Sequence, residues 1–118
     1  MRALVVDNDD SMQKLVLRLL DREGWTGITA ADDREAFAAF MVGWFDVAII
    51  DVDLDAGSDG IELAKILRKL DPALPIVMIS GDSFNAARVK KARLHHFFAK
   101  PFQIESISSV LRTIAPRT

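Results

Sequence analysis

Short apolar runs alternate with longer amphipathic stretches from one end of the chain to the other. Four short runs rich in apolar residues predict β-strands at residues 3–6, 47–50, 76–79 and 97–99, and a weaker run predicts one at residues 26–30. All but the weaker run lack polar alternation, which is typical of parallel strands covered by helices on both faces. The regular alternation of strand and helix predicts consecutive βα units.

The first amphipathic stretch has apolar residues at helical spacing, and Gly24 stands where that helix should end. Its predicted buried stripe comprises Met12, Leu15, Val16, Leu19 and Leu20. Asp32 and Asp59 are each followed three residues later by a glutamate, which is the pattern of a helix N-cap. The predicted buried faces of these two helices comprise Ala36, Phe37, Phe40 and Met41 for the first, and Leu63, Ile66, Leu67 and Leu70 for the second.

The apolar spacing predicts the last two helices at residues 83–93 and 103–114. Their apolar positions are Ala86, Val89, Ala92 and Leu94 in the fourth helix, and Ile104, Ile107, Leu111 and Ile114 in the fifth. Right-handed crossovers on five parallel strands favour the order 2-1-3-4-5, which is an α/β, doubly wound (βα)5, flavodoxin-like three-layer sandwich. Ligands of such folds bind at the carboxyl ends of the strands, here beside the first and third.

Acidic residues stand at this position. Asp7 follows the first strand and Asp51 follows the third, so we expect the two carboxylates to converge. Crowded carboxylates repel each other unless a cation joins them, and oxygen ligands completed by water suit Mg²⁺. An acidic residue at a strand end often does no more than cap the next helix, as we expect of Asp9, Asp10 and Asp59. The convergence of two central strands favours a metal site here.

A hydroxyl and a lysine follow the last two strands. Ser80 stands before Gly81, and Lys100 stands before Pro101 in an X-Pro bond that can be cis. A Ser-Gly pair is also an ordinary turn signal, and a lone lysine can extend past a sheet into solvent. Together with the carboxylates, however, a hydroxyl and an ammonium group at one rim are components of a phosphoryl-transfer site.

The chain resembles the receiver domain of bacterial two-component response regulators over nearly its whole length. The motifs that carry the resemblance are Leu4-Val5-Val6-Asp7, Ile49-Ile50-Asp51, Asp59-Gly60, Ile79-Ser80-Gly81 and Lys100-Pro101-Phe102. The resemblance implies a stand-alone receiver at residues 1–118 without an effector domain. It also implies that this receiver is not an enzyme, although it promotes its own phosphorylation and dephosphorylation. It also implies a sensor histidine kinase or histidine phosphotransfer protein as phosphoryl donor, and a downstream effector protein as target.

The resemblance also implies a role for each residue at the rim. The phosphoacceptor is Asp51, and the ligands of Mg²⁺ are Asp7, Asp51 and the backbone carbonyl of Asp53, with Asn8 or Asp9 as a further candidate. Ser80 binds a phosphoryl oxygen, and Lys100 pairs first with Asp51 and then with the phosphate. Ser80 and the aromatic residue Phe97 form the conformational switch, although plain core packing explains Phe97 equally well.

Three features depart from the family pattern. Asn8 replaces a second acidic residue after the first strand, which predicts weaker Mg²⁺ binding because one negative charge is lost. Leu54-Asp55 replaces the usual Met-Pro after the acceptor, in a loop one residue longer than the commonest. Arg93-Leu94 replaces a pair of small residues before the fifth strand, which leaves the packing of the fourth helix open.

Composition limits the classes of partner. The 118 residues suffice for one domain, and 15 Lys and Arg against 17 Asp and Glu give a net charge of −2, unlike a dedicated nucleic-acid binder. The chain contains no cysteine and no apolar run near the roughly 18 residues of a membrane span. We therefore expect a cytoplasmic protein without a membrane or direct nucleic-acid partner.

The sequence predicts a basic patch at residues 88–96, formed by Arg88, Lys90, Lys91, Arg93, His95 and His96. It predicts either an acidic partner surface or a solvated helix face. The family resemblance adds that the face made by the fourth helix, fifth strand and fifth helix can form a homodimer.

Three other functions compete with a working receiver. Ile50-Asp51-Val52-Asp53 also resembles the Asp-x-Asp motif of haloacid-dehalogenase-type phosphatases, but no acidic metal motif follows Lys100. A flavodoxin-like FMN binder shares the topology, but the acidic segment after the first strand would repel phosphate. A degenerate receiver that acts only as an interaction module is favoured weakly by Asn8 and opposed by the presence of Asp51, Ser80 and Lys100.

Overall fold

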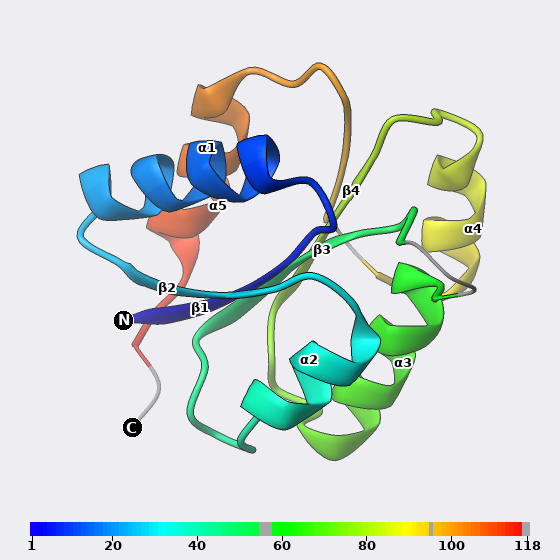
Figure 1. Cartoon of the computed structure of the whole chain (residues 1–118), viewed down its shortest axis with the longest axis horizontal. Helices are drawn as coiled ribbons and strands as arrows, with labels where there is room; N and C mark the ends of the chain where they lie inside the picture. Colours follow the sequence, from blue (N-terminus) through cyan, green and yellow to red (C-terminus); the bar gives the residue numbers. More distant parts are fainter. Residues whose placement is uncertain (55–57, 95, 117–118) are drawn as a thin grey trace.

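The chain folds into a single five-stranded sheet with helices on both faces, as the computed structural model in Figure 1 shows for residues 1–54, 58–94 and 96–116. The strands are β1 (Arg2–Val6), β2 (Thr26–Ala30), β3 (Val47–Asp51), β4 (Ile76–Ser80) and β5 (His96–Ala99). The helices are α1 (Asp10–Arg22), α2 (Asp33–Ala39), α3 (Gly60–Leu70), α4 (Asn85–Lys91) and α5 (Ile104–Thr113). All paired strands are parallel and their order is β2-β1-β3-β4-β5, so the predicted fold is confirmed.

Aspartate side chains cap the N-termini of three helices. The side chains of Asp9, Asp32 and Asp59 accept hydrogen bonds from backbone amides in the first turns of α1, α2 and α3. These contacts satisfy amides that have no partner within the helix. The predicted caps are confirmed for these residues, whereas Asp10 is the first residue of α1 and does not cap it.

Two apolar clusters lie on opposite faces of the sheet. Alternate residues of the strands point to each face, so that Val5 and Ile49 belong to the cluster with buried residues of α1 and α5, while Leu4 and Ile50 belong to the cluster with buried residues of α2, α3 and α4. Figure 1 shows α1 and α5 on one side of the sheet and the other three helices on the opposite side. This arrangement leaves the carboxyl ends of β1, β3 and β4 free to carry polar groups.

The predicted buried faces of α2 and α3 are partly wrong. Phe37 lies within α2 and is 41% exposed, whereas Met41 is 58% exposed because α2 ends at Ala39 and Met41 no longer follows the helical spacing. Ile66 and Leu70 are 45% and 51% exposed. The buried face of α3 keeps the predicted Leu63 and Leu67 but otherwise comprises Gly60, Ile61 and Ala64.

The α4 and β5 region differs most from prediction. Helix α4 covers seven residues and buries Asn85 and Val89, while Ala86 is exposed. Strand β5 is an edge strand with partly exposed residues, not one covered on both faces. Ile104 in α5 is also more than one-third exposed. Asp55 and His95, which the sequence analysis considered, lie outside the described residues.

Candidate functional site

Two carboxylates meet where the central strands end. Asp7 directly follows β1 and Asp51 is the last residue of β3, and the register of Val6 with Ile50 places them at the same level. Their exposed fractions are 3% and 4%. The predicted convergence of Asp7 and Asp51 is therefore observed, in a place where water screens their charges poorly.

Lys100 joins the two carboxylates. Its Nζ lies 2.8 Å from Oδ2 of Asp51 and 3.4 Å from Oδ2 of Asp7. The lysine follows β5, its backbone amide donates a hydrogen bond to the carbonyl of Ser80, and its bond to Pro101 is cis. The surface alternative for this lysine is wrong, because its ammonium group points into the acidic site.

Burial and mutual charge alter the acid–base properties of this cluster. Burial raises the pKa of Asp7 above its usual value and the charge of Asp51 adds to this, although the Asp9 amide and Lys100 act in the opposite direction. Burial by itself lowers the pKa of Lys100, but its hydrogen bond to Asp51 and the charges of both carboxylates raise the pKa overall. Two carboxylates thus share one ammonium group, and a further cation would relieve their repulsion.

The donor set fits a magnesium ion. No group of three or more acidic, histidine or cysteine side chains converges on a metal position within the described part of the chain. Two carboxylates, a backbone carbonyl and water are nevertheless a normal set for Mg²⁺, which keeps several of its waters. The side chain of Asn8 is exposed, and one oxygen of Asp9 already caps α1, so Asp9 has less freedom to act as a ligand.

Gly60 lets α3 approach the end of β3. A Cβ atom at this position would lie 1.9 Å from the carbonyl oxygen of Asp51, which is far inside van der Waals contact with the backbone. The amide of Gly60 also donates a hydrogen bond to the carbonyl of Val52. The Asp59-Gly60 motif is therefore explained by two physical needs, which are a cap for α3 and room for the Asp51 backbone.

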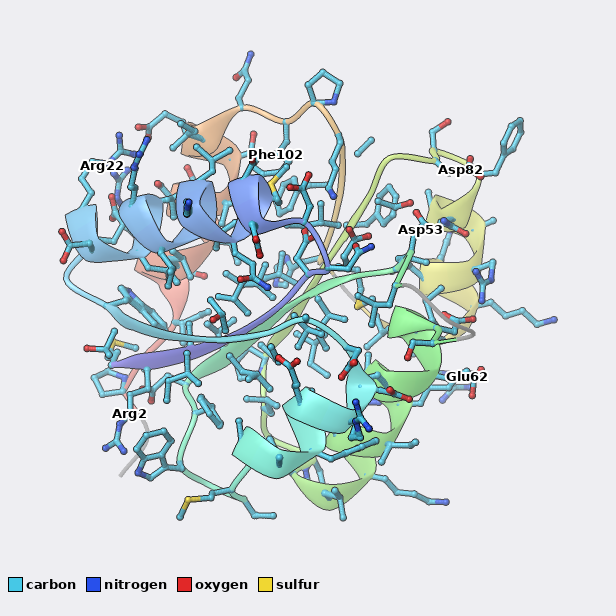
Figure 2. The ribbon with its side chains drawn as sticks, in the orientation of Figure 1. Arg2, Arg22, Asp53, Glu62, Asp82 and Phe102 are labelled. Atoms are coloured by element: carbon cyan, nitrogen blue, oxygen red, sulfur yellow. The ribbon has the colours of Figure 1, made fainter. Side chains whose placement is uncertain are left out.

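Ser80 lies at the same rim and its hydroxyl contacts Asp53. The Ser80 Oγ donates a hydrogen bond to Oδ2 of Asp53 at 2.8 Å and accepts one from the amide of Asp82 at 3.0 Å. Figure 2 shows Asp53 beyond the end of β3 and Asp82 in the loop before α4, on the same edge of the molecule. The predicted location of Ser80 is observed, while its hydroxyl binds the side chain of Asp53.

Asn85 and Arg88 belong to this region, although the sequence analysis did not place them there. Asn85 is buried and its Nδ2 donates a hydrogen bond to Ser80 Oγ at 2.9 Å. Arg88 donates to Oδ1 of Asn85 and forms an ion pair with Asp59. Asn85 stands four residues before Val89, so its position on the buried face of α4 was the available signal.

Phe97 is half-buried and packs against the apolar cluster that includes Val89 and Leu94. The role of Phe97 in a conformational switch stays a prediction.

Among the described residues, no helix is long and apolar enough to cross a membrane.

Residues 3–112 match the family model for the response regulator receiver domain. The transcriptional regulatory protein TcrA of Mycobacterium tuberculosis is 32% identical over 118 residues, which cover 98% of this chain and 46% of TcrA. The probable regulator TcrX of the same organism is 32% identical over 117 residues, which cover 98% of this chain and 50% of TcrX. The chain thus spans about half the length of these curated relatives.

Solved structures agree with this assignment. The chemotaxis protein CheY4 of Vibrio cholerae has a TM-score of 0.82 and 29% identity, with 97% of this chain and 98% of that chain covered. The response regulator TrrA of Thermotoga maritima, solved in complex with Mg²⁺ and beryllium fluoride, has a TM-score of 0.86 at the same coverage, and its 24% identity shows the fold alone. These matches do not favour the phosphatase and FMN-binding alternatives. Because the family model covers nearly the whole chain and the paired carboxylates, Ser80 and Lys100 stand at one rim, the chain belongs to the response regulator receiver domains, the phosphoacceptors of two-component systems.

Proposed function

We propose that Asp51 accepts a phosphoryl group from the phosphohistidine of a sensor kinase or a histidine phosphotransfer protein in the cytoplasm. The observation that supports this most is the buried Asp51 carboxylate, which is bonded to Lys100 and lies beside Asp7. The receiver then changes its surface and thereby controls a downstream effector protein. The face formed by α4, β5 and α5 is a candidate surface for this contact or for a homodimer.

In the proposed transfer, a carboxylate oxygen of Asp51 attacks the phosphorus atom. The P–N bond to the donor imidazole breaks, the imidazole leaves with the bonding electrons and takes a proton from water, and Asp51 becomes an acyl phosphate. The Asp53 amide donates a hydrogen bond to Oδ1 of Asp51 at 2.9 Å and so orients the carboxylate. Lys100 holds a positive charge next to the reacting group, because its pKa is raised.

Asp7, Asp51 and the backbone carbonyl of Asp53 would hold Mg²⁺ at this site. When bound, the ion supplies positive charge that offsets the repulsion between the carboxylates and the incoming phosphoryl oxygens. The amide of Asn8 contributes no negative charge, so we expect weaker binding of the ion than in a receiver with a second acidic residue there. Replacement of Asn8 by Asp should therefore strengthen Mg²⁺ binding, measured by titration of the unphosphorylated protein.

After transfer, the Ser80 hydroxyl would donate a hydrogen bond to a phosphoryl oxygen on Asp51. A phosphoryl group adds close to two negative charges and strong acceptor oxygens, which can shift an equilibrium between two conformations. The movement of Ser80 draws its loop and α4 with it, and Phe97 turns inward into the space that opens.

The direct test is incubation with Mg²⁺ and acetyl phosphate, followed by intact-mass measurement. We expect the wild type to gain one phosphoryl group and Asp51→Asn to gain none, with no gain in either protein when the divalent ion is chelated. A phosphoryl group retained by Asp51→Asn would move the acceptor elsewhere. An unmodified wild type, under conditions that modify a control receiver, would favour a phosphorylation-independent interaction module.

A further inference from the structure

We infer that Asp53 is a positioning residue that holds the Ser80 hydroxyl in the unphosphorylated state and must release it before the receiver can switch. This inference rests on the proposed function and extends it from the acceptor to the group that reads the phosphate. Five residues take part, and together we call them the Ser80 latch: Asp53, Asp59, Ser80, Asn85 and Arg88.

The hydrogen-bonding capacity of Ser80 is fully used in this state. A serine hydroxyl has one proton to donate and two lone pairs to accept with. The proton goes to Asp53, and the lone pairs accept from the amide of Asp82 and from Nδ2 of Asn85. Ser80 is completely buried, so water cannot supply a replacement partner without a structural change.

Asp53 therefore competes with the phosphoryl group for a single proton. A phosphoryl oxygen on Asp51 has no proton of its own to give in its ionised form, so the Ser80 hydroxyl must act as the donor. It can do so only after leaving Oδ2 of Asp53. Hydrogen bonds to an ionised acceptor are roughly twice as strong as those between neutral groups, so the carboxylate is an effective competitor.

The latch also connects Ser80 to both neighbouring helices. Asn85 lies in α4, and its Nδ2 is 3.4 Å from Oδ1 of Asp53 in addition to its contact with Ser80. Its Oδ1 accepts a hydrogen bond from Arg88 at 3.1 Å. Arg88 in turn pairs with Asp59, the N-cap of α3. A buried amide that loses its partner is costly, so movement of Ser80 forces Asn85 to find a new arrangement.

This coupling works in both directions. If phosphorylation of Asp51 weakens the contacts that hold α4, then a partner that stabilises the released α4 must stabilise the phosphorylated state by the same free energy. The latch reaches the surface at Asp53, which is exposed, and at the ion pair of Arg88 with Asp59, whose side chains are 49% and 33% exposed. A partner that engages Arg88 thus has direct access to the latch.

The test compares Asp53→Asn with Glu62→Gln by titration with beryllofluoride, a mimic of the phosphoryl group, at saturating Mg²⁺. Both variants remove one exposed carboxylate, but Glu62 pairs with Lys65 on α3 and Figure 2 shows it away from Asp53. We expect Asp53→Asn to bind beryllofluoride about five- to tenfold more tightly than the wild type, because a neutral acceptor holds Ser80 less strongly. Glu62→Gln should stay within about twofold of the wild type.

Side-chain amide resonances of Asn85, observed by NMR in protein without any phosphoryl mimic, report on the latch itself. We expect them to shift in Asp53→Asn and to stay in place in Glu62→Gln. Arg88→Gln, which changes a half-exposed residue, should shift the same resonances and raise the beryllofluoride affinity by a smaller factor of about two.

An Asp53→Asn protein with wild-type affinity for beryllofluoride, or with unshifted Asn85 resonances, would overturn the inference. The proposed function fails in a different way: the wild type would then bind no beryllofluoride and accept no phosphoryl group on Asp51, and the positioning role would fall with it. A wild type that accepts phosphate normally, with an Asp53→Asn variant that is indistinguishable from it, would reject the latch alone.

Discussion

Helices α1 and α5 on one face of the sheet bury several apolar side chains, whereas α4 on the other face buries one apolar and one polar residue. Val16, Leu19 and Leu20 of α1 are buried together with Ile107 and Leu111 of α5. Helix α4 buries Val89 and the polar residue Asn85, and its N-cap residue, Phe84, makes no side-chain cap hydrogen bond. Helices α1 and α5 therefore each bury more apolar residues than α4 does.

This difference indicates which part of the molecule can move. Apolar burial is non-directional and is lost only when the helix leaves the sheet. Hydrogen bonds can be exchanged one for another when a new acceptor appears, at little net cost in free energy. The polar contacts of α4 lead to Ser80 at the proposed phosphoryl site, so we expect a charge added to Asp51 to rearrange α4 while α1 and α5 stay in place.

The largest expected effect comes from the apolar face. Leu20→Ala should lower the free energy of unfolding by about 2–5 kcal/mol, because Leu20 is fully buried and its loss leaves a cavity. The measurement is urea denaturation followed by tryptophan fluorescence. The affinity for beryllofluoride, measured well below the unfolding transition, should remain within about twofold of the wild type.

Val89→Ala is the matched change on α4. It should lower the free energy of unfolding by less, about 2 kcal/mol. It should also alter the affinity for beryllofluoride, because Val89 is the buried apolar residue of α4. Equal effects of the two substitutions on beryllofluoride binding would contradict the division between a fixed face and a movable one.

Gly60→Ala tests the close approach of α3 to the end of β3. The added methyl group would lie 1.9 Å from the Asp51 carbonyl oxygen, so the helix must shift, at an expected cost of about 3 kcal/mol. Acetyl phosphate should also modify this variant more slowly, since the Asp51 backbone moves. Gly81→Ala is the stability control, because a methyl group there meets no atom within 4 Å. A wild-type unfolding curve for Gly60→Ala would show that α3 adjusts without strain.

Asp7→Asn should stabilise the metal-free protein, by a smaller free energy than any of the three substitutions Leu20→Ala, Val89→Ala and Gly60→Ala costs. The raised pKa of Asp7 means that the folded state favours the protonated form, so stability is lost as the pH rises through this pKa. The gain in the free energy of unfolding of Asp7→Asn should be present at pH 7 and shrink as the pH falls towards 3.8, the ordinary pKa of an aspartate. Denaturation curves at several pH values, with the exposed Asp21→Asn as control, measure it. A gain that is independent of pH would rule out this cause.

The smallest effect is expected at the ion pairs that join α1 and α5. Arg112 lowers the pKa of Glu23, so this pair contributes stability above the ordinary pKa of 4.5 and loses it as the pH falls through the lowered value. Arg112→Gln should therefore reduce the thermal midpoint slightly at pH 7 and low salt, and less at high salt. A large loss would mean that polar contacts, and not apolar burial, hold the α1 and α5 face.

Much of the fold could be predicted because its signals are local. Strand positions followed from uncharged Val- and Ile-rich runs, and the caps at Asp9, Asp32 and Asp59 followed from their side chains. The rotation of a helix about its own axis could not be predicted in the same way. In α3, Ile66 fits the helical spacing as well as Ala64 does, and the close approach at Gly60 decides which of them is buried.

The sequence by itself determined the sheet order and the meeting of Asp7, Asp51 and Lys100 at its carboxyl edge, because burial pattern and strand connection are properties of short segments. Only the tertiary structure decided where the proton of Ser80 goes. Its acceptor, Asp53, and its donor from α4, Asn85, belong to different segments and compete through distances of a few ångströms. Hydrogen bonds depend steeply on such distances, whereas the hydrophobic pattern that shapes the sheet does not.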